Sequence, residues 1–170
     1  MNTSSAIDQR HRRTRARLNE LGFELGTAPT PIANFVPAVR IGELVYTSGQ
    51  LPLKSGVLIQ AGKLGAEVDT NLGQELAAVS VLNALAAAAA VCDLDAARVV
   101  RVMGYVASTA NFSDQPAVIN GASDLLVDVF GSRGHHARSA VGVTALPLNA
   151  PVEVELILSV VDEASADETV

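Results

Sequence analysis

The sequence predicts a single α/β domain of the α+β type, in which two long helices cover one face of a mixed β-sheet. Three observations predict it. Apolar segments occur in the order strand, strand, helix, strand, helix, strand, strand. The strand segments alternate in polarity, whereas the helical segments are apolar all round or on one face. The 170 residues suffice for one domain with a substantial core, and no internal repeat is evident.

Composition and charge exclude several classes of protein. Apolar residues make up 49% of the chain, which is too high for an intrinsically disordered protein. The net charge of −6 disfavours nonspecific binding of nucleic acids, which needs a basic surface. The single cysteine, Cys92, excludes an internal disulfide and fits a reducing cytosol. Because it ends an alanine-rich helix, we expect a small buried residue rather than a nucleophile.

No membrane or secretion signal is evident. The N-terminal segment is polar and basic, without the apolar stretch that completes a signal peptide. The longest apolar run, residues 76–91, is interrupted by Ser80 and Asn83 and is too short to span a bilayer. We therefore expect a soluble, cytoplasmic protein that contacts neither membranes nor nucleic acids.

The N-terminal segment carries a basic helix. Residues 1–5 are expected to be disordered, and residues 7–21 to form a helix that Gly22 ends. Five arginines cluster on this helix, at positions 10, 12, 13, 15 and 17. They could contact RNA or an acidic partner, but a solvated helix that packs through Leu18 and Leu21 is the simpler interpretation.

The sequence divides into three segments. Residues 1–28 form the tail and helix, residues 29–162 the main domain, and residues 163–170 an acidic tail that we expect to be mobile. An extended linker at residues 28–31, rich in proline, leads into the main domain.

The first half of the main domain contains short strands and the longer helix. Strands are predicted over 35–41 and 44–48, with a third over 57–60 after a turn. The two glycines of residues 62–65 lack the spacing of a phosphate-binding loop, so this segment is interpreted as an ordinary loop. Asp69 or Thr70 caps a largely buried helix that ends near Cys92.

The second half begins with a strand over 98–108. A helix follows from Ser113 or Asp114 to Phe130, with proline in its first turn and glycine after its end. The last two strands, 139–145 and 152–161, are predicted to pair as an antiparallel hairpin.

Strand alternation assigns the charged residues of this predicted hairpin to faces. Val152 and every second residue to Val160 should face the helices, and Glu153 and Glu155 the opposite side. Hairpin pairing would set Thr144 opposite Glu153, and Arg138 on the same face roughly 20 Å away. Such a distance allows no shared small-molecule site within one chain. The helix-free face needs a cover, and self-association would provide both the cover and an intersubunit site.

The chemistry of such a site is limited but specific. An arginine binds a carboxylate through two parallel hydrogen bonds, so Arg138 would orient a small organic acid. Glu153 could position a water molecule or carry its proton, and hydrolysis of a reactive C=N bond needs little more. An interface salt bridge is the alternative role for Arg138.

The same residues carry a family resemblance. The segments 46–50 (YTSGQ), Asn120, 138–141 (RSAV), 146–147 (LP) and 152–155 (VEVE) occur in the order and spacing of the YjgF/YER057c/UK114 (RidA) family. The resemblance covers about residues 31–161. The N-terminal helix, with residues 62–65 and 135–140, most resembles the long subgroup called chorismate-mutase-like.

This resemblance implies a homotrimer of chorismate-mutase-like subunits, with helices outside and three intersubunit clefts. It also implies hydrolysis, without a cofactor, of enamine or imine intermediates of small carboxylates to 2-keto acids and ammonia. By position, Arg138 would hold the substrate carboxylate and Glu153 would place the attacking water. Ser48 and Asn120 would line the cleft.

At two substrate-binding positions the sequence departs from the family pattern. Phe35 replaces a tyrosine that the deaminases usually carry, and Ala140 replaces a frequent cysteine. The substrate therefore stays open. A second function remains open too, namely a trimeric protein that binds a small carboxylate, or regulates through it, without turnover.

Other sites are disfavoured. Adjacent His135 and His136 point to opposite sides of an extended chain and have no third ligand at a useful spacing, so no metal is expected. Ser139 lacks the strand-turn-helix surroundings of a nucleophile. Ribonuclease activity is disfavoured by the acidic charge, and mutase activity on a dianion by the lack of cations other than Arg138.

Overall fold

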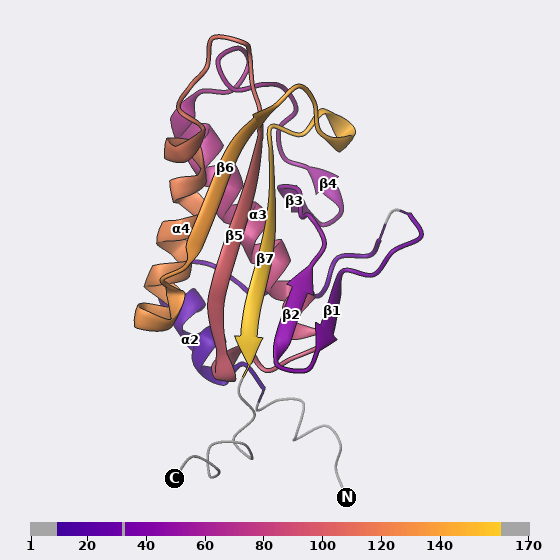
Figure 1. The fold of residues 1–170 in the computed structure, drawn as a ribbon, viewed down its shortest axis with the longest axis vertical. Coiled ribbons are helices and arrows are strands. Elements are labelled where there is room, and N and C mark those ends of the chain that lie inside the picture. The colour runs from indigo at the N-terminus through magenta and orange to yellow at the C-terminus, as the bar shows by residue number, and fades with distance from the viewer. Residues whose placement is uncertain (1–9, 32, 161–170) are drawn as a thin grey trace, which may run out of the picture.

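A five-stranded sheet with two long helices on one face forms the core of the protein. The computed structural model describes residues 10–31 and 33–160. The strand order is β1-β2-β7-β5-β6, and Figure 1 views the sheet from its helix-free side. Its strands are β1 (Ala38–Ile41), β2 (Leu44–Thr47), β5 (Ala97–Ala107), β6 (Ala137–Val143) and β7 (Val152–Val160). The predicted mixed sheet is confirmed.

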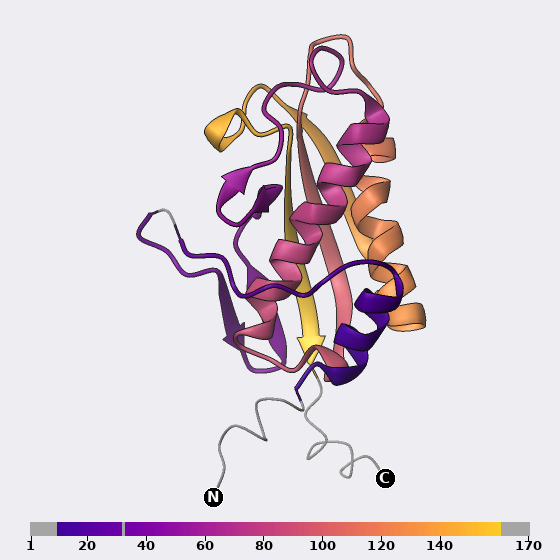
Figure 2. The ribbon, with the colours of Figure 1, turned by 180° about the vertical axis from the view of Figure 1, so that it is seen from behind.

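The helices lie together on the far side of the sheet, as Figure 2 shows. They are α3 (Thr70–Ala89) and α4 (Gln115–Phe130), with the shorter α2 (Arg12–Glu20) beside the end of α4. Two short strands, β3 (Leu53–Lys54) and β4 (Val57–Leu58), pair separately. Short 3-10 turns cover Leu94–Ala96, Gly131–Gly134 and Pro147–Asn149.

Helix α3 begins where the sequence predicts. The Asp69 carboxylate accepts a hydrogen bond from the Leu72 N–H at 2.8 Å, which satisfies one free donor of the first turn. By length and composition α3 could cross a membrane, but most of it is buried in the core. Cys92, just beyond its end, is buried as expected.

Alternation along β7 is confirmed. Val152, Val154, Leu156, Leu158 and Val160 are buried on the helix side, and the residues between them are half-buried. Opposite Val154 on β5 stands Gly104, where a Cβ would overlap the Ile119 side chain of α4. Glycine at this position therefore lets α4 approach the sheet closely.

The predicted hairpin of the last two strands is wrong. Strand β5 lies between them, pairing in parallel with β6 and antiparallel with β7. The physical reason is the connection from β5 through α4, since a strand-helix-strand crossover returns the chain parallel to its first strand. Alternation in a sequence assigns residues to faces within one strand and says nothing about which strands are neighbours.

The correct pairing also moves Arg138 to the other face. Arg138 aligns with Val102 of β5, which aligns with the buried Leu156 of β7. Residues in register share a face, so Arg138 lies on the side of the helices. Glu153 aligns instead with Tyr105, on the helix-free side. The expectation that Arg138 and Glu153 share a face is therefore wrong.

Helix α2 packs onto the domain as the simpler interpretation predicts. Leu18 is fully buried and Leu21 packs against the core. Asp95 binds the start of the helix, accepting hydrogen bonds from the backbone N–H of Arg13 and Thr14. The predictions for residues 1–9 and 161–170 lie outside the described residues.

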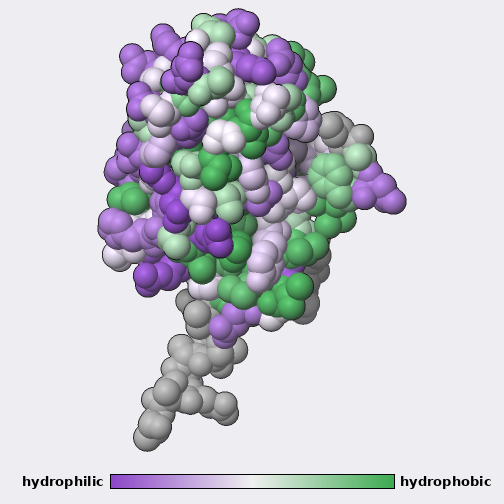
Figure 3. All heavy atoms as spheres, turned by 45° about the horizontal axis from the view of Figure 1, so that its top comes forward, coloured by the Kyte–Doolittle hydropathy of each residue, from purple (hydrophilic) through white to green (hydrophobic). Residues whose placement is uncertain are grey.

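The helix-free face exposes apolar side chains. Val39, Ile41 and Tyr46 are exposed on β1 and β2, and Ile41 is 69% exposed. Val141 on β6 is also exposed and is in register with Tyr105 on this face. Figure 3 shows hydrophobic residues at the surface on this side. A bare sheet face is confirmed, whereas its covering by self-association stays a prediction.

Candidate functional site

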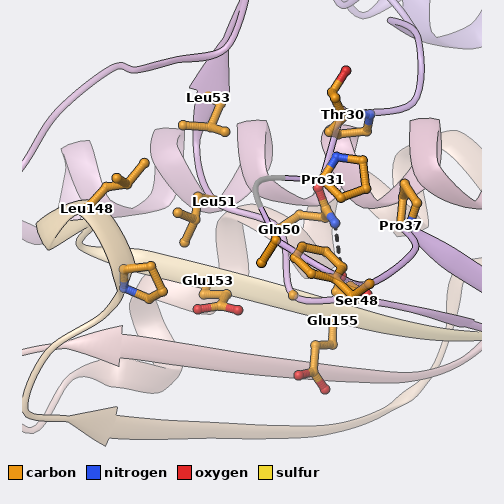
Figure 4. Close-up of a pocket in the computed structure, with 15 residues that line it drawn as sticks. Thr30, Pro31, Pro37, Ser48, Gln50, Leu51, Leu53, Leu148, Glu153 and Glu155 are labelled. Atoms are coloured by element: carbon orange, nitrogen blue, oxygen red, sulfur yellow. Dashed lines mark hydrogen bonds between the residues drawn. The ribbon is translucent and has the colours of Figure 1, made fainter.

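A cavity of about 530 Å³ opens beside β7. Figure 4 shows its walls, with Glu153 and Glu155 on β7, Leu148 at one side and Ser48 at the other. It is lined by Pro29, Thr30, Pro31, Ala33, Phe35, Pro37, Ser48, Gly49, Gln50, Leu51, Leu53, Pro147, Leu148, Glu153 and Glu155. Of the six predicted site residues, the cavity brings together Phe35, Ser48 and Glu153.

The position of Glu153 depends on the segment after β2. Gln50 and Val154 exchange both backbone hydrogen bonds, at 2.9 and 3.0 Å, which fix residues 48–50 along β7. A Cβ at Gly49 would overlap the Glu153 carboxylate, so the carboxylate lies directly over the glycine. Gly49 is a site residue that sequence reasoning missed, although it lies in the resembling segment 46–50.

Burial raises the pKa of Glu153 above its usual range, and the neighbouring Glu155 carboxylate raises it further. Within the described residues no cation forms an ion pair with Glu153. Burial, and after it the nearby Glu155 carboxylate, raises the pKa of Tyr105. The cavity thus contains a half-buried carboxylate that binds a proton more readily than a solvated glutamate.

Ser48 and Phe35 form the opposite wall. The Ser48 hydroxyl donates to the Val36 carbonyl at 2.7 Å, so its proton is already used within the chain. The Ser48 N–H bonds the Pro37 carbonyl at 2.8 Å. Phe35 is 45% exposed and offers an apolar ring without a hydroxyl. This wall can therefore accept hydrogen bonds through Ser48 and otherwise presents apolar surface.

Arg138 belongs to a separate cluster between β6 and α4. One terminal nitrogen of its guanidinium, Nη1, donates to Asn120 Oδ1 at 2.8 Å and to Ser123 Oγ at 3.1 Å. Ala140, two residues along β6, packs against the core on the same side. This cluster contains Arg138, Asn120 and Ala140 of the predicted site residues, and their role in a site stays a prediction. Ser123 was missed because a serine inside a helix gives no sequence signal.

The two clusters lie apart within one chain. Arg138 on β6 and Glu153 on β7 are separated by the width of two strand spacings, because β5 lies between them. They are also offset by three residues along the strand direction, which puts their Cα atoms about 14 Å apart. Their side chains also point to opposite faces. This distance between Arg138 and Glu153 is shorter than the one expected from a hairpin. It is still too long for one chain to bring both groups to one small molecule.

The two histidines differ in their surroundings. His135 is exposed, whereas His136 hydrogen-bonds both Ser123 and the Gly134 carbonyl through its two ring nitrogens. Among the described residues, no three histidine, cysteine, aspartate or glutamate side chains converge as metal ligands would.

A family model described as Endoribonuclease L-PSP matches residues 25–160. That range contains both clusters. The chain belongs to this family, the YjgF/RidA family. The recognition made from the sequence motifs is therefore confirmed.

Members of the RidA family resemble the chain over most of its length. Protein TCP17 of Trypanosoma cruzi is 41% identical over 149 residues, covering 86% of this chain and 93% of TCP17. A Dermatophagoides farinae protein named 2-iminobutanoate/2-iminopropanoate deaminase is 31% identical over 131 residues, covering 77% of this chain and 89% of the deaminase. The crystal structure of Atu1372 from Agrobacterium tumefaciens, of unknown function, is 40% identical with a TM-score of 0.82, covering 94% of this chain and 100% of Atu1372.

Proposed function

We propose that the protein hydrolyses reactive enamine or imine intermediates of small carboxylates to 2-keto acids and ammonia, without a cofactor. The observation that carries the proposal is Glu153, a half-buried carboxylate with a raised pKa, facing a cavity without a cation of its own. The relative named a deaminase supports the same reaction class.

The reaction needs one carboxylate clamp and one proton carrier. Arg138 holds the substrate carboxylate through the guanidinium edge to which no described residue is hydrogen-bonded. Glu153 accepts a proton from water, whose oxygen forms a bond to the C=N carbon. Glu153 returns this proton to the nitrogen, which gives a neutral carbinolamine. The hydroxyl proton of the carbinolamine then moves through Glu153 to the nitrogen as the C=O double bond forms and the C–N bond breaks, so that the keto acid and ammonia leave. A raised pKa suits a group that must both accept and return a proton near neutral pH.

We infer that this site forms between subunits of a homotrimer. The bare sheet face with exposed Val39, Ile41 and Tyr46 supports association, because a large apolar patch is normally covered. The separation of Arg138 from Glu153 supports a cleft in which one subunit supplies each group.

The test is keto-acid release from enzymatically generated 2-aminoacrylate. Wild-type protein should release pyruvate faster than buffer, and Glu153→Gln should lower the rate by about 10²- to 10⁴-fold, the usual contribution of a general acid–base group. Arg138→Ala should chiefly raise KM. Glu24→Gln, at an exposed glutamate outside the cavity, is the matched control and should behave like wild type. A wild-type rate equal to the buffer rate would exclude this substrate.

The second candidate is a carboxylate-binding protein without turnover. Phe35 favours it, because this wall lacks the hydroxyl that a tyrosine would supply. Binding of pyruvate to a protein that leaves 2-aminoacrylate untouched, with loss of that binding in Arg138→Ala, would select it.

Ribonuclease activity fits the cavity poorly. Its charged lining residues are Glu153 and Glu155, which repel a phosphate backbone.

A further inference from the structure

A chain of hydrogen bonds runs from the backbone at Gly134 to the guanidinium of Arg138. His136 Nδ1 lies 2.6 Å from the Gly134 carbonyl oxygen, and His136 Nε2 lies 3.0 Å from Ser123 Oγ. Ser123 Oγ in turn accepts from Arg138 Nη1 at 3.1 Å. His136 immediately precedes β6, Arg138 lies near the start of that strand, and Ser123 lies on α4.

The donors and acceptors in this series of hydrogen bonds have only one consistent order when His136 is neutral. A carbonyl oxygen can only accept, so His136 Nδ1 carries the ring proton and Nε2 is an acceptor. The Ser123 hydroxyl therefore donates to Nε2, which leaves its oxygen lone pairs for the Arg138 N–H. His136 is thus fully engaged and does not serve as a base or a metal ligand in this arrangement.

The backbone at Gly134, where this series of hydrogen bonds begins, is held in place by its neighbours. Gly134 is buried against α4, where a Cβ would overlap the Leu126 carbonyl. Arg133, next to it, donates to the carbonyls of Asp95 and Ala97 at 2.9 and 2.6 Å. His136 and Arg138 are two residues apart on an extended chain, so both project toward α4.

The arrangement selects which edge of the guanidinium remains available. Both N–H groups of Arg138 Nη1 are used, one by Ser123 and one by Asn120. Nε and Nη2 donate no hydrogen bond within the described part of the chain. These two nitrogens form the parallel fork that matches a carboxylate. Because Asn120 and Ser123 bind Nη1, the fork of Nε and Nη2 is oriented to bind a substrate carboxylate.

We propose that Ser123 and His136 are positioning residues, which form a hydrogen-bond relay that orients Arg138 to bind the substrate carboxylate. The inference rests on the proposed function, in which Arg138 is the carboxylate clamp. It adds two residues that do not touch the substrate and act through the arginine alone.

Kinetics with 2-aminoacrylate test the relay. Ser123→Ala and His136→Leu should each raise KM on the order of tenfold, the scale of one hydrogen bond to a charged group, with kcat within about twofold of wild type. Ser123→Thr, which keeps the hydroxyl, and His136→Gln, which keeps an acceptor, should restore most of the affinity. Matched controls are Ser132→Ala and His135→Leu, at exposed neighbours, which should leave KM unchanged.

The ring proton of His136 gives a readout independent of activity. Nitrogen NMR of the wild type should find the neutral ring protonated on Nδ1, and Ser123→Ala should broaden the Nε–H signal of Arg138. A ring protonated on Nε2, or KM values for Ser123→Ala and His136→Leu that match those of the controls, would overturn the relay. Failure of the proposed function differs from both, because the wild type itself would then show no turnover.

Discussion

The carboxylate of Glu153 lies over Gly49 with no space for another atom between them. Glycine is required there for a steric reason, not for an unusual backbone angle. The placement of the Glu153 carboxylate in the cavity therefore depends on Gly49, which has no side chain. Two predictions follow from this contact and from the neighbouring Glu155.

Gly49→Ala should displace the Glu153 carboxylate with little loss of folding stability, because the added methyl meets the free end of a flexible side chain that can move away. Turnover of 2-aminoacrylate should fall because of this displacement. Gly26→Ala is the matched control, since a Cβ there meets nothing within 4 Å. Steady-state rates of both variants with 2-aminoacrylate measure the difference, and equal rates would contradict the described contact.

Glu155→Gln should move the acidic limb of the pH–rate profile to lower pH. Burial is the first cause of the raised pKa of Glu153, and the charge of Glu155 is the second. Removing that charge favours ionised Glu153, so its pKa falls and the active base persists at lower pH. The measurement is kcat/KM against pH, with Glu24→Gln as control. A limb that stays in place would show that Glu155 does not influence the catalytic carboxylate.

At the scale of elements, the helix and strand predictions hold because they rest on local physics. The Asp69 cap, the glycine after Phe130 and the alternation of β7 depend on neighbours within a few residues. The hairpin prediction failed because pairing depends on the crossover through α4, a tertiary feature. Ser123 and Gly49 were missed for the same reason, since their partners are distant in sequence.

The two long helices differ in how they begin. Asp69 caps α3 with a side-chain hydrogen bond, whereas Asp114 before α4 makes none. Asp69→Ala should therefore cost about 1 kcal/mol of folding stability, the typical value of a cap. Asp114→Ala is the matched control and should cost less. Urea midpoints compare the two, and an equal loss would mean that the bond to Leu72 contributes nothing.

At the scale of the whole molecule, the sequence motifs predicted the family and the separation of the two charged groups, while the register revealed that they face opposite sides. One chain holds both halves of the proposed site yet cannot combine them. The functional unit we propose is therefore the oligomer.

Mixing two variants that each lack one of these groups tests this directly. Arg138→Ala and Glu153→Gln, unfolded together in equal amounts and refolded, should regain activity, because about one cleft in four of a random trimer receives both intact groups. Refolding each variant alone, assayed at the same substrate concentration well below the KM of Arg138→Ala, is the control and should give only the low rate of that variant. Activity that fails to reappear in a refolded, trimeric mixture would place both groups in the same subunit.

The position of β7 has a consequence for synthesis of the chain. Among the described residues it is the last strand in sequence, and it is the central strand of the sheet, hydrogen-bonded to β2 on one side and β5 on the other. Until β7 has been synthesised, the β1–β2 and β5–β6 pairs lack the strand that joins them within the sheet, and α3 lacks a strand on which much of it packs. The sheet can therefore close only after β7 has been synthesised, and until then the partly folded chain exposes apolar surface that chaperones bind.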